Sequence, residues 1–228
     1  MTTIIFGILE EGLVYAIMAL GVYITYKILD FPDLSVDGTF PLGAAVTAAG
    51  IANGLPFIGT ISPVAALFIS FTVGALAGCI IGLIHVKLKV RDLLSGIIVM
   101  TALYSINLRI AGKANLPIFS KETIFSNSFL SAHVPEAASP FIVTIILFVI
   151  VMICKVLLDA YLQTRSGYLL RAVGDNDVLV TSLAKDKGLV KIVGLAIANG
   201  FAALAGSVYC QQKGFFEISI GTGTMVIG

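Results

Sequence analysis

Five long apolar runs constrain what this chain of 228 residues can fold into. They cover residues 12–29, 63–87, 93–111, 141–158 and 192–209, and each holds at least 18 residues. About 20 apolar residues in a helix are enough to cross the hydrocarbon core of a bilayer. Hydrophobic residues make up 58% of the chain and charged residues only 12%, roughly half the charged share of an average soluble protein. The sequence therefore predicts an all-α, polytopic helical membrane protein.

A sixth apolar stretch is interrupted near its start. Residues 30–41 hold three acidic residues and two prolines, Pro32 and Pro41, which are expected to prevent a continuous helix. The apolar residues 42–52 that follow are too few to cross a bilayer as a straight helix. Two interpretations fit: a re-entrant element beside a translocation path, or a cytoplasmic loop that leads into a span starting near Val36. We count about six spans.

Small residues recur on one face of the run at residues 63–87. Gly74, Gly78 and Gly82 are four residues apart, a spacing that lets two membrane helices approach closely. We expect this face to pack within the bundle rather than at a subunit interface. In the run at residues 192–209, the amide of Asn199 is expected to find a partner inside the bundle.

Basic residues predict the orientation. Lysine and arginine gather at Lys27, at residues 87–91 and at residues 163–191, which places these segments in the cytoplasm and the N-terminus outside. Residues 113–139 then lie outside. Their apolar side chains predict a short amphipathic helix on the membrane surface and part of a landing surface for a binding protein; these side chains are Ile118, Phe119, Ile124, Phe125 and Phe129.

The longest polar interval between two spans, residues 163–191, also contains apolar residues. Two short helices are predicted, separated by turn residues Gly174, Asp175 and Asn176. Apolar residues at a cytoplasmic surface favour docking of a soluble partner protein. The alternative is a solvated loop whose apolar residues lie on the bilayer.

Three motifs add a family resemblance. RSGYLLRAVGDN at residues 165–176, DLSVDGTF at residues 33–40 and LSGIIVMTALYSINLRIAG at residues 94–112 resemble permeases of bacterial ABC importers of the branched-chain amino acid and ribose type. The second motif departs from the DLSVG signature of ribose-type permeases by Asp37. With the preceding residues it gives FPDLSVDGTF, which resembles a subgroup that works with lipoprotein-type binding proteins.

The resemblance implies roles for particular residues. Residues 163–188 would form a cytoplasmic loop that couples to an ATPase, within a single transmembrane permease domain of residues 1–228. The coupling residues would be Tyr168, Leu169, Leu170, Arg171, Gly174, Asp175 and Asn176. A broken helix near the pathway would carry Asp33, Ser35, Asp37, Gly38 and Thr39.

The resemblance also implies partners and a location. They are a separate ABC ATPase subunit, an extracytoplasmic substrate-binding lipoprotein and a second permease copy, identical or homologous, in the bacterial cell membrane. Permeases of this family have two similar halves, and residues 211–228 resemble the beginning of the first half. We therefore expect an incomplete two-repeat bundle with the start of a seventh span, lacking roughly two to four further helices by typical span length.

Enzyme motifs are absent from the sequence. There is no GxxxxGK[ST] phosphate loop, so ATP would be hydrolysed in a partner subunit, and no cluster of histidine and cysteine has metal-ligand spacing. We expect no cofactor, and the net charge of +1 gives no reason to expect a nucleic-acid partner. Two other functions stay open: a transporter driven by an ion gradient, which would need paired ionisable residues at mid-membrane depth, and a scaffold subunit.

Overall fold

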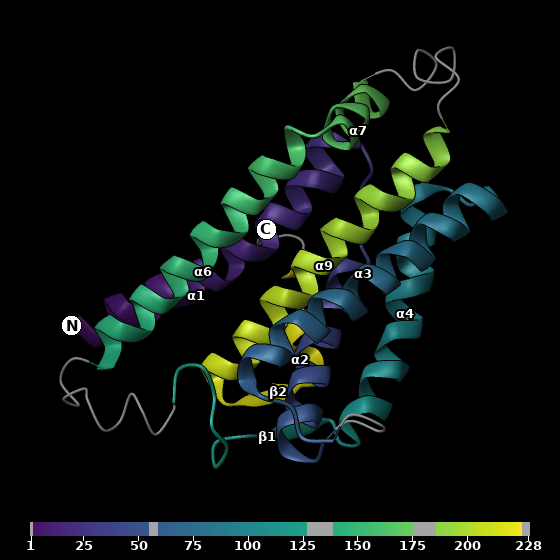
Figure 1. Ribbon diagram of the computed structural model, residues 1–228. Coiled ribbons are helices and arrows are strands. Elements are labelled where there is room, and N and C mark those ends of the chain that lie inside the picture. The colour runs from purple at the N-terminus through teal and green to yellow at the C-terminus, as the bar shows by residue number, and fades with distance from the viewer. Residues whose placement is uncertain (1, 55–58, 127–138, 176–185, 225–228) are drawn as a thin grey trace.

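The computed structural model describes residues 2–54, 59–126, 139–175 and 186–224, and its long helices run between the same two ends of the molecule (Figure 1). In chain order the first elements are α1 (Thr2–Val22), the π-helix η1 (Tyr23–Ile28), α2 (Val36–Ala52), α3 (Pro63–Leu88) and α4 (Asp92–Ala111). They are followed by β1 (Asn115–Pro117), α6 (Ser139–Leu162), α7 (Arg165–Asp175), α9 (Lys187–Lys213), β2 (Phe215–Glu217) and the 3₁₀ helix η3 (Ile218–Gly221).

Within the part of the chain that the structure describes, five helical segments are long and apolar enough to cross a membrane. They are Ile4–Ile28, Pro63–Leu88, Asp92–Ala111, Phe141–Leu162 and Lys187–Lys213. They coincide with the five apolar runs, so the predicted class of all-α polytopic membrane protein is confirmed. Helix α2 is shorter, with 17 residues, and is about 25 Å long at the usual helical rise. Counted with the others, it gives the expected number of about six.

Proline does not interrupt α2 as the sequence suggested. The helix begins at Val36 and continues through Pro41, so the expectation that Pro41 prevents a continuous helix is wrong. Proline in a helix removes one N–H and crowds the carbonyl four residues earlier, which here belongs to Asp37. Gly221 of η3 packs directly against this carbonyl and the Pro41 ring, and a Cβ at Gly221 would collide with both. The distorted turn is thus covered by protein, as irregular backbone within a membrane protein must be.

Helix α2 is the centre of the bundle. Fifteen of its 17 residues are buried, so it has no face left for lipid or water. It contacts α3, α4 and α9 directly, and Figure 1 shows it among them. By contrast, α6 packs mainly on α1 and leaves large apolar side chains exposed on its outer side, among them Phe148, Ile153 and Leu157. These exposed residues form a surface suited to lipid.

Small residues let α9 approach both α2 and α3 closely. Gly74, Gly78 and Gly82 of α3 face the backbone of α9 near Asn199, Leu195 and Ile192 respectively. On the side of α2, Gly43 lies against the backbone carbonyl of Ala203, and Gly206 of α9 lies against that of Phe40. At these positions there is no space for a Cβ atom. The three helices are therefore held together by backbone contact, which in a bilayer supplies much of the attraction between helices.

The contact between α3 and α9 predicts a marked difference between two glycine substitutions. Gly78→Ala would place a Cβ against the carbonyl of Leu195, forcing the helices apart and lowering the midpoint of thermal unfolding in detergent by several degrees. Gly12→Ala is the matched control, because no atom lies within 4 Å of the added Cβ and alanine favours a helix. Equal thermal midpoints for the two variants would contradict the packing described.

The two ends of the bundle differ in structure. At the lower end in Figure 1, β1 pairs antiparallel with β2, so that buried Leu116 faces buried Phe216. Residues 118–126 form turns, so the predicted surface helix is wrong for this segment; Phe129 lies outside the described residues. The reason is that the N–H of Ile118 donates to the carbonyl of Gly214 at 2.8 Å, which ties the segment to the end of α9. Helix α7 lies at the opposite end.

Candidate functional site

The side chain of Asn199 connects two distant segments inside the bundle. Its Nδ2 donates to Oδ2 of Asp33 at 2.8 Å, and its Oδ1 accepts from the hydroxyls of Thr39 at 2.7 Å and Ser35 at 3.1 Å. Oδ1 of Asp33 accepts from the backbone N–H of Ser35 at 2.9 Å. All four side chains are buried, with at most 1% of their surface exposed. Their polar groups are satisfied by one another, which burial away from water requires.

Asp33 is the carboxyl group of this network and lies in the connection between η1 and α2. Burial raises its pKa, while the hydrogen bonds from Ser35 and Asn199 act in the opposite direction. The hydrogen bonds thus stabilise the charged form, and no basic side chain among the described residues pairs with this carboxylate. Asp33 and Ser35 thus fix the end of the connection to the centre of the bundle, whereas Asp30 at its start is exposed.

A second buried network lies two turns further along α2. The hydroxyl of Thr47 is 2.6 Å from that of Ser207 on α9 and 3.1 Å from that of Ser70 on α3. Ser70 also donates to the backbone carbonyl of Gly43 at 3.1 Å. The hydroxyls link the same three helices that pack through small residues. Short polar side chains between close helices are common in membrane bundles, so we assign this cluster to packing.

Loss of the Asn199 amide is expected to destabilise the fold in a way that depends on Asp33. Asn199→Leu and Asp33→Leu each leave buried polar groups without partners and should each lower the free energy of unfolding by about 1–3 kcal/mol. The double variant should lose less free energy of unfolding than the sum of the two single variants, because neither Asp33 nor Asn199 is then left buried without the other. Unfolding titrations of the four proteins measure this coupling. Strictly additive losses would show that the two side chains do not depend on each other.

A polar-lined cavity of about 320 Å³ opens between α2, α4 and η3. Its polar lining comes from Asp37 on α2, from Thr101, Tyr104 and Asn107 on α4, and from Thr222. Asn107 is 1% exposed, and its Nδ2 donates to the carbonyl of Gly38 at 3.0 Å. Its Oδ1 has no hydrogen-bond partner among the described residues. A buried acceptor without a partner beside a cavity is a group that a ligand can satisfy.

The five predicted pathway residues divide between these two places. Asp33, Ser35 and Thr39 lie in the Asn199 network, away from the cavity. Asp37 and Gly38 line the cavity. The Asp37 carboxylate accepts from the N–H of Gly223 at 3.0 Å and from the hydroxyl of Thr224 at 2.9 Å, and so it joins α2 to the segment after η3. Periodicity explains this division, because Ser35 and Thr39 are one turn apart on the face toward α9.

The polar side chains of the fourth span were not among the predicted pathway residues. Thr101, Tyr104 and Asn107 line the cavity, and their spacing of three residues is the signal that they share a helix face. Ser105 does not line the cavity and is exposed. The sequence did not indicate that Thr222 lines the cavity, because its position depends on how the segment after α9 folds back onto α2.

The predicted coupling residues lie on two sides of α7. Leu170 is fully buried and touches Gly194 of α9, while Gly174 packs against the carbonyl of Ile28. Helix α7 includes Gly174 and Asp175, so the turn predicted at these two residues is wrong; Asn176 lies outside the described residues. The exposed side consists of Tyr168, Arg171 and Asp175, with Leu169 half-buried. The apolar side of α7 is therefore covered by the protein itself.

Membrane-length helices that pack around buried polar networks, with a cavity that holds several polar side chains between two of them, define a polytopic membrane protein. The family described as "Branched-chain amino acid transport system / permease component" matches residues 4–228. The chain therefore belongs to this family, and it is a membrane-spanning permease subunit of an ABC transporter for a small solute. Permeases of this family are transport proteins, not enzymes, and the family assignment favours ATP-driven transport over a gradient-driven mechanism.

Two curated relatives are similar to the chain over almost all of its length. The chain is 45% identical, over 224 residues, to the tyrosine transport system permease protein of Clostridioides difficile; the match covers 98% of this chain and 70% of that protein. It is 34% identical, over 220 residues, to an uncharacterized protein of Rickettsia prowazekii, with 96% of this chain and 72% of that protein covered. No solved structure matches the chain.

Proposed function

We propose that this chain forms part of the translocation path of a bacterial importer for an amino acid. The observation that supports an amino acid is the 45% identity to a tyrosine transport permease. The motif FPDLSVDGTF supports a subgroup whose solute is delivered by a lipoprotein. A second permease copy, identical or homologous, completes the path, and the assembly resides in the bacterial cell membrane.

The cavity between α2 and α4 is the proposed contact point for the solute. It offers a carboxylate, hydroxyl groups and the open acceptor Oδ1 of Asn107, whereas its remaining walls are apolar. These groups complement an amino group and an uncharged side chain. The cavity is a little larger than the lower limit of known ligand pockets, about 300 Å³, which suits a ligand of amino-acid size.

Uptake measurements on the complete transporter, reconstituted with its ATPase and binding protein in liposomes, test this function. We expect accumulation of tyrosine or a related amino acid that needs internal ATP and persists when ion gradients are dissipated. Asn107→Leu should lower uptake about tenfold, the equivalent of one hydrogen bond in the transport step. Ser105→Ala, on the same helix but exposed and outside the cavity lining, is the control and should transport normally.

Two outcomes of this uptake experiment would contradict the proposal. Uptake that depends on an ion gradient and not on ATP would exclude an ATP-driven importer. Normal uptake by a folded Asn107→Leu variant would remove the cavity from the solute path while leaving the class of transporter intact. Thermal unfolding of both variants, measured first, distinguishes loss of transport from loss of fold.

The exposed side of α7 is the proposed docking surface for the ATPase. Tyr168 is 60% exposed and Arg171 also faces outward, and these two residue types supply much of the binding energy at many protein interfaces. Because Leu170 and Val173 are buried against the permease, α7 can transmit force without bending away from the bundle. Closure of two ATPases would then move α7 as a rigid element and switch access to the path.

Substitution of the outward residues tests the docking surface. Tyr168→Ala combined with Arg171→Ala should weaken the bound ATPase by a factor of about ten or more, judged by co-purification and by solute-stimulated ATP hydrolysis. Lys155→Ala with Asp159→Ala is the matched control. It removes two charged, exposed side chains of the neighbouring helix α6, whose Nζ and Oδ2 atoms form an ion pair at 2.9 Å. Retention of the ATPase by the first double variant would exclude this surface. Loss in that variant alone would also assign the α7 end to the cytoplasm.

The opposite end is the proposed landing surface for the substrate-binding lipoprotein. There the paired strands β1 and β2 and the turns of residues 118–126 are tied to the end of α9. The N–H of Ile124 also donates to the side chain of Gln211 at 3.2 Å. Because this surface is hydrogen-bonded to the end of α9, binding of a partner protein there can shift α9.

A further inference from the structure

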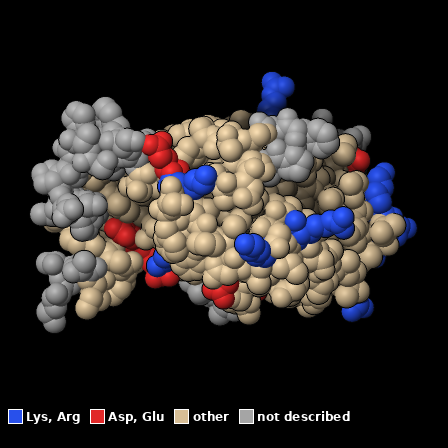
Figure 2. Space-filling view, turned by 90° about the horizontal axis from the view of Figure 1, so that it is seen from below, with Lys and Arg blue, Asp and Glu red and all other residues tan. Residues whose placement is uncertain are grey.

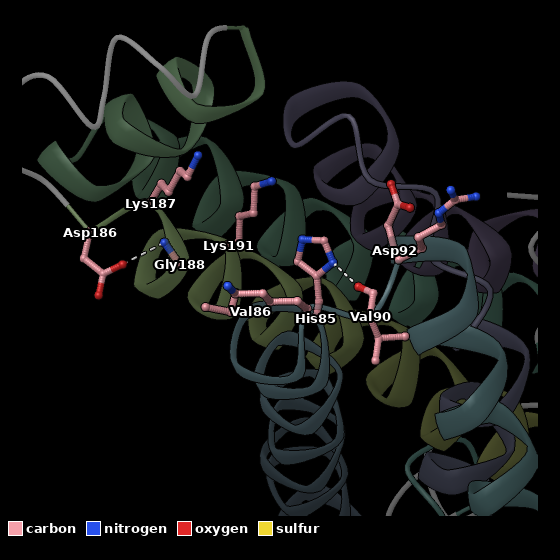
Figure 3. A pocket seen from close by; sticks show the side chains of 10 residues that line it. His85, Val86, Val90, Asp92, Asp186, Lys187, Gly188 and Lys191 are labelled. Atoms are coloured by element: carbon pink, nitrogen blue, oxygen red, sulfur yellow. Dashed lines mark hydrogen bonds between the residues drawn. The ribbon is translucent and has the colours of Figure 1, made fainter.

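A pocket of about 580 Å³ lies at the α7 end of the bundle, apart from the cavity described above. It is bounded by the C-terminal turn of α3, the start of α4 and the start of α9. Figure 3 shows Lys187 and Lys191 extending from α9 above His85 of α3, with Asp92 on the far side. Two segments that are distant in the sequence, residues 85–92 and 186–191, thus contribute side chains to one space.

The pocket carries an excess of positive charge. Its lining includes four basic side chains, Lys89, Arg91, Lys187 and Lys191, and two carboxylates, Asp92 and Asp186. Asp186 is engaged locally, because it caps α9 by accepting from the N–H of Gly188 at 2.8 Å. Figure 2 shows the wider trend: basic side chains gather toward the right of the view, and most of the visible acidic ones lie toward the left.

Packing fixes the shape of this pocket. A ring nitrogen of His85, Nδ1, lies 2.9 Å from the carbonyl of Val90 and so joins the end of α3 to the turn before α4. Lys89 ends α3 in the left-handed conformation, with φ of 54°, which turns the chain sharply. On the other side, Gly188 has no side chain where a Cβ would lie 2.5 Å from Val86. The backbone that carries the basic side chains is therefore held in place by these contacts.

Exposed apolar side chains lie close in sequence to two of these basic groups. Leu88, which adjoins Lys89, is 70% exposed, and Leu94 on α4, three residues after Arg91, is 52% exposed. A soluble anion would use only the basic groups. A molecule with a charged head and an apolar tail would contact both kinds of surface.

We propose that this pocket binds the headgroup of an anionic phospholipid, with the acyl chains along the exposed leucines Leu88 of α3 and Leu94 of α4. A basic pocket between helices at a membrane surface suits such headgroups, and each lysine or arginine near the surface adds favourable energy. The proposal rests only on insertion of the chain in a membrane, and holds whatever solute the transporter carries. The lipid would join α3 and α9 at the end where α7 packs.

Thermal unfolding of the purified permease in detergent, with added lipid, tests the proposal. Phosphatidylglycerol should raise the unfolding midpoint in a saturable way, and phosphatidylcholine should not. Lys89→Gln with Lys191→Gln should weaken the apparent affinity for phosphatidylglycerol on the order of tenfold. Lys89→Arg with Lys191→Arg keeps the charge and should restore the response. Lys155→Gln with Lys213→Gln removes two basic residues outside the pocket and should respond as the native chain does.

Three results would overturn this assignment. The first is an equal response to phosphatidylglycerol in the native and glutamine variants. The second is stabilisation by glycerol 3-phosphate or inorganic phosphate as strong as that by lipid, which would make the pocket a site for a soluble anion. The third is stabilisation by the ATPase subunit and not by lipid, which would make it a protein contact. If the glutamine variant does not fold, the same titrations with the native chain at high salt, which screens the pocket charges, replace it.

Discussion

The amide of Asn199 can be satisfied only if helix α9, the connection before α2 and the first turn of α2 are all in place. In a membrane interior, no water is available to replace a missing partner, so these hydrogen bonds and the helix arrangement depend on each other. The same register continues along the two helices. Thr39 bonds to Asn199 and Thr47 to Ser207, and both pairs are 160 residues apart in sequence. Helices α2 and α9 therefore run parallel without slipping by a turn.

Close approach and polar bonding support each other in this core. Short side chains can bond across helices only where the backbones are near, and glycine or alanine provides that nearness. Gly43 lies against Ala203 midway between the two hydrogen-bonded pairs. The cavity at α4 and the outward side of α7 lie outside this close-packed centre. Under the proposed function, these are the regions that contact solute and ATPase.

Much of the fold was predictable because span length and helix spacing are local properties. The apolar runs located five helices, and the period of four in the glycines of α3 indicated a close helix contact. Sequence did not indicate that the partner is α9, since that depends on contacts more than a hundred residues away. The same limit hid the pairing of β1 with β2, where Leu116 meets Phe216. It also hid the support from Gly221 that accommodates Pro41 within α2.

For the candidate site, the sequence indicated which residue types are present but not which way each side chain points. Leu170 was predicted to dock a partner protein, yet the helix turns it toward Gly194 and leaves Tyr168 exposed. This placement gives the proposed coupling a physical route. Gly174 rests on the last turn of η1, and η1 leads within a few residues to Asp33, which holds Asn199 of α9. A shift of α7 would act on η1 and α9 together, at the two segments that the central network joins. π-Helical segments are frequent at functional sites. Here the π-helix η1 lies where a movement of α7 would first be passed to the rest of the bundle.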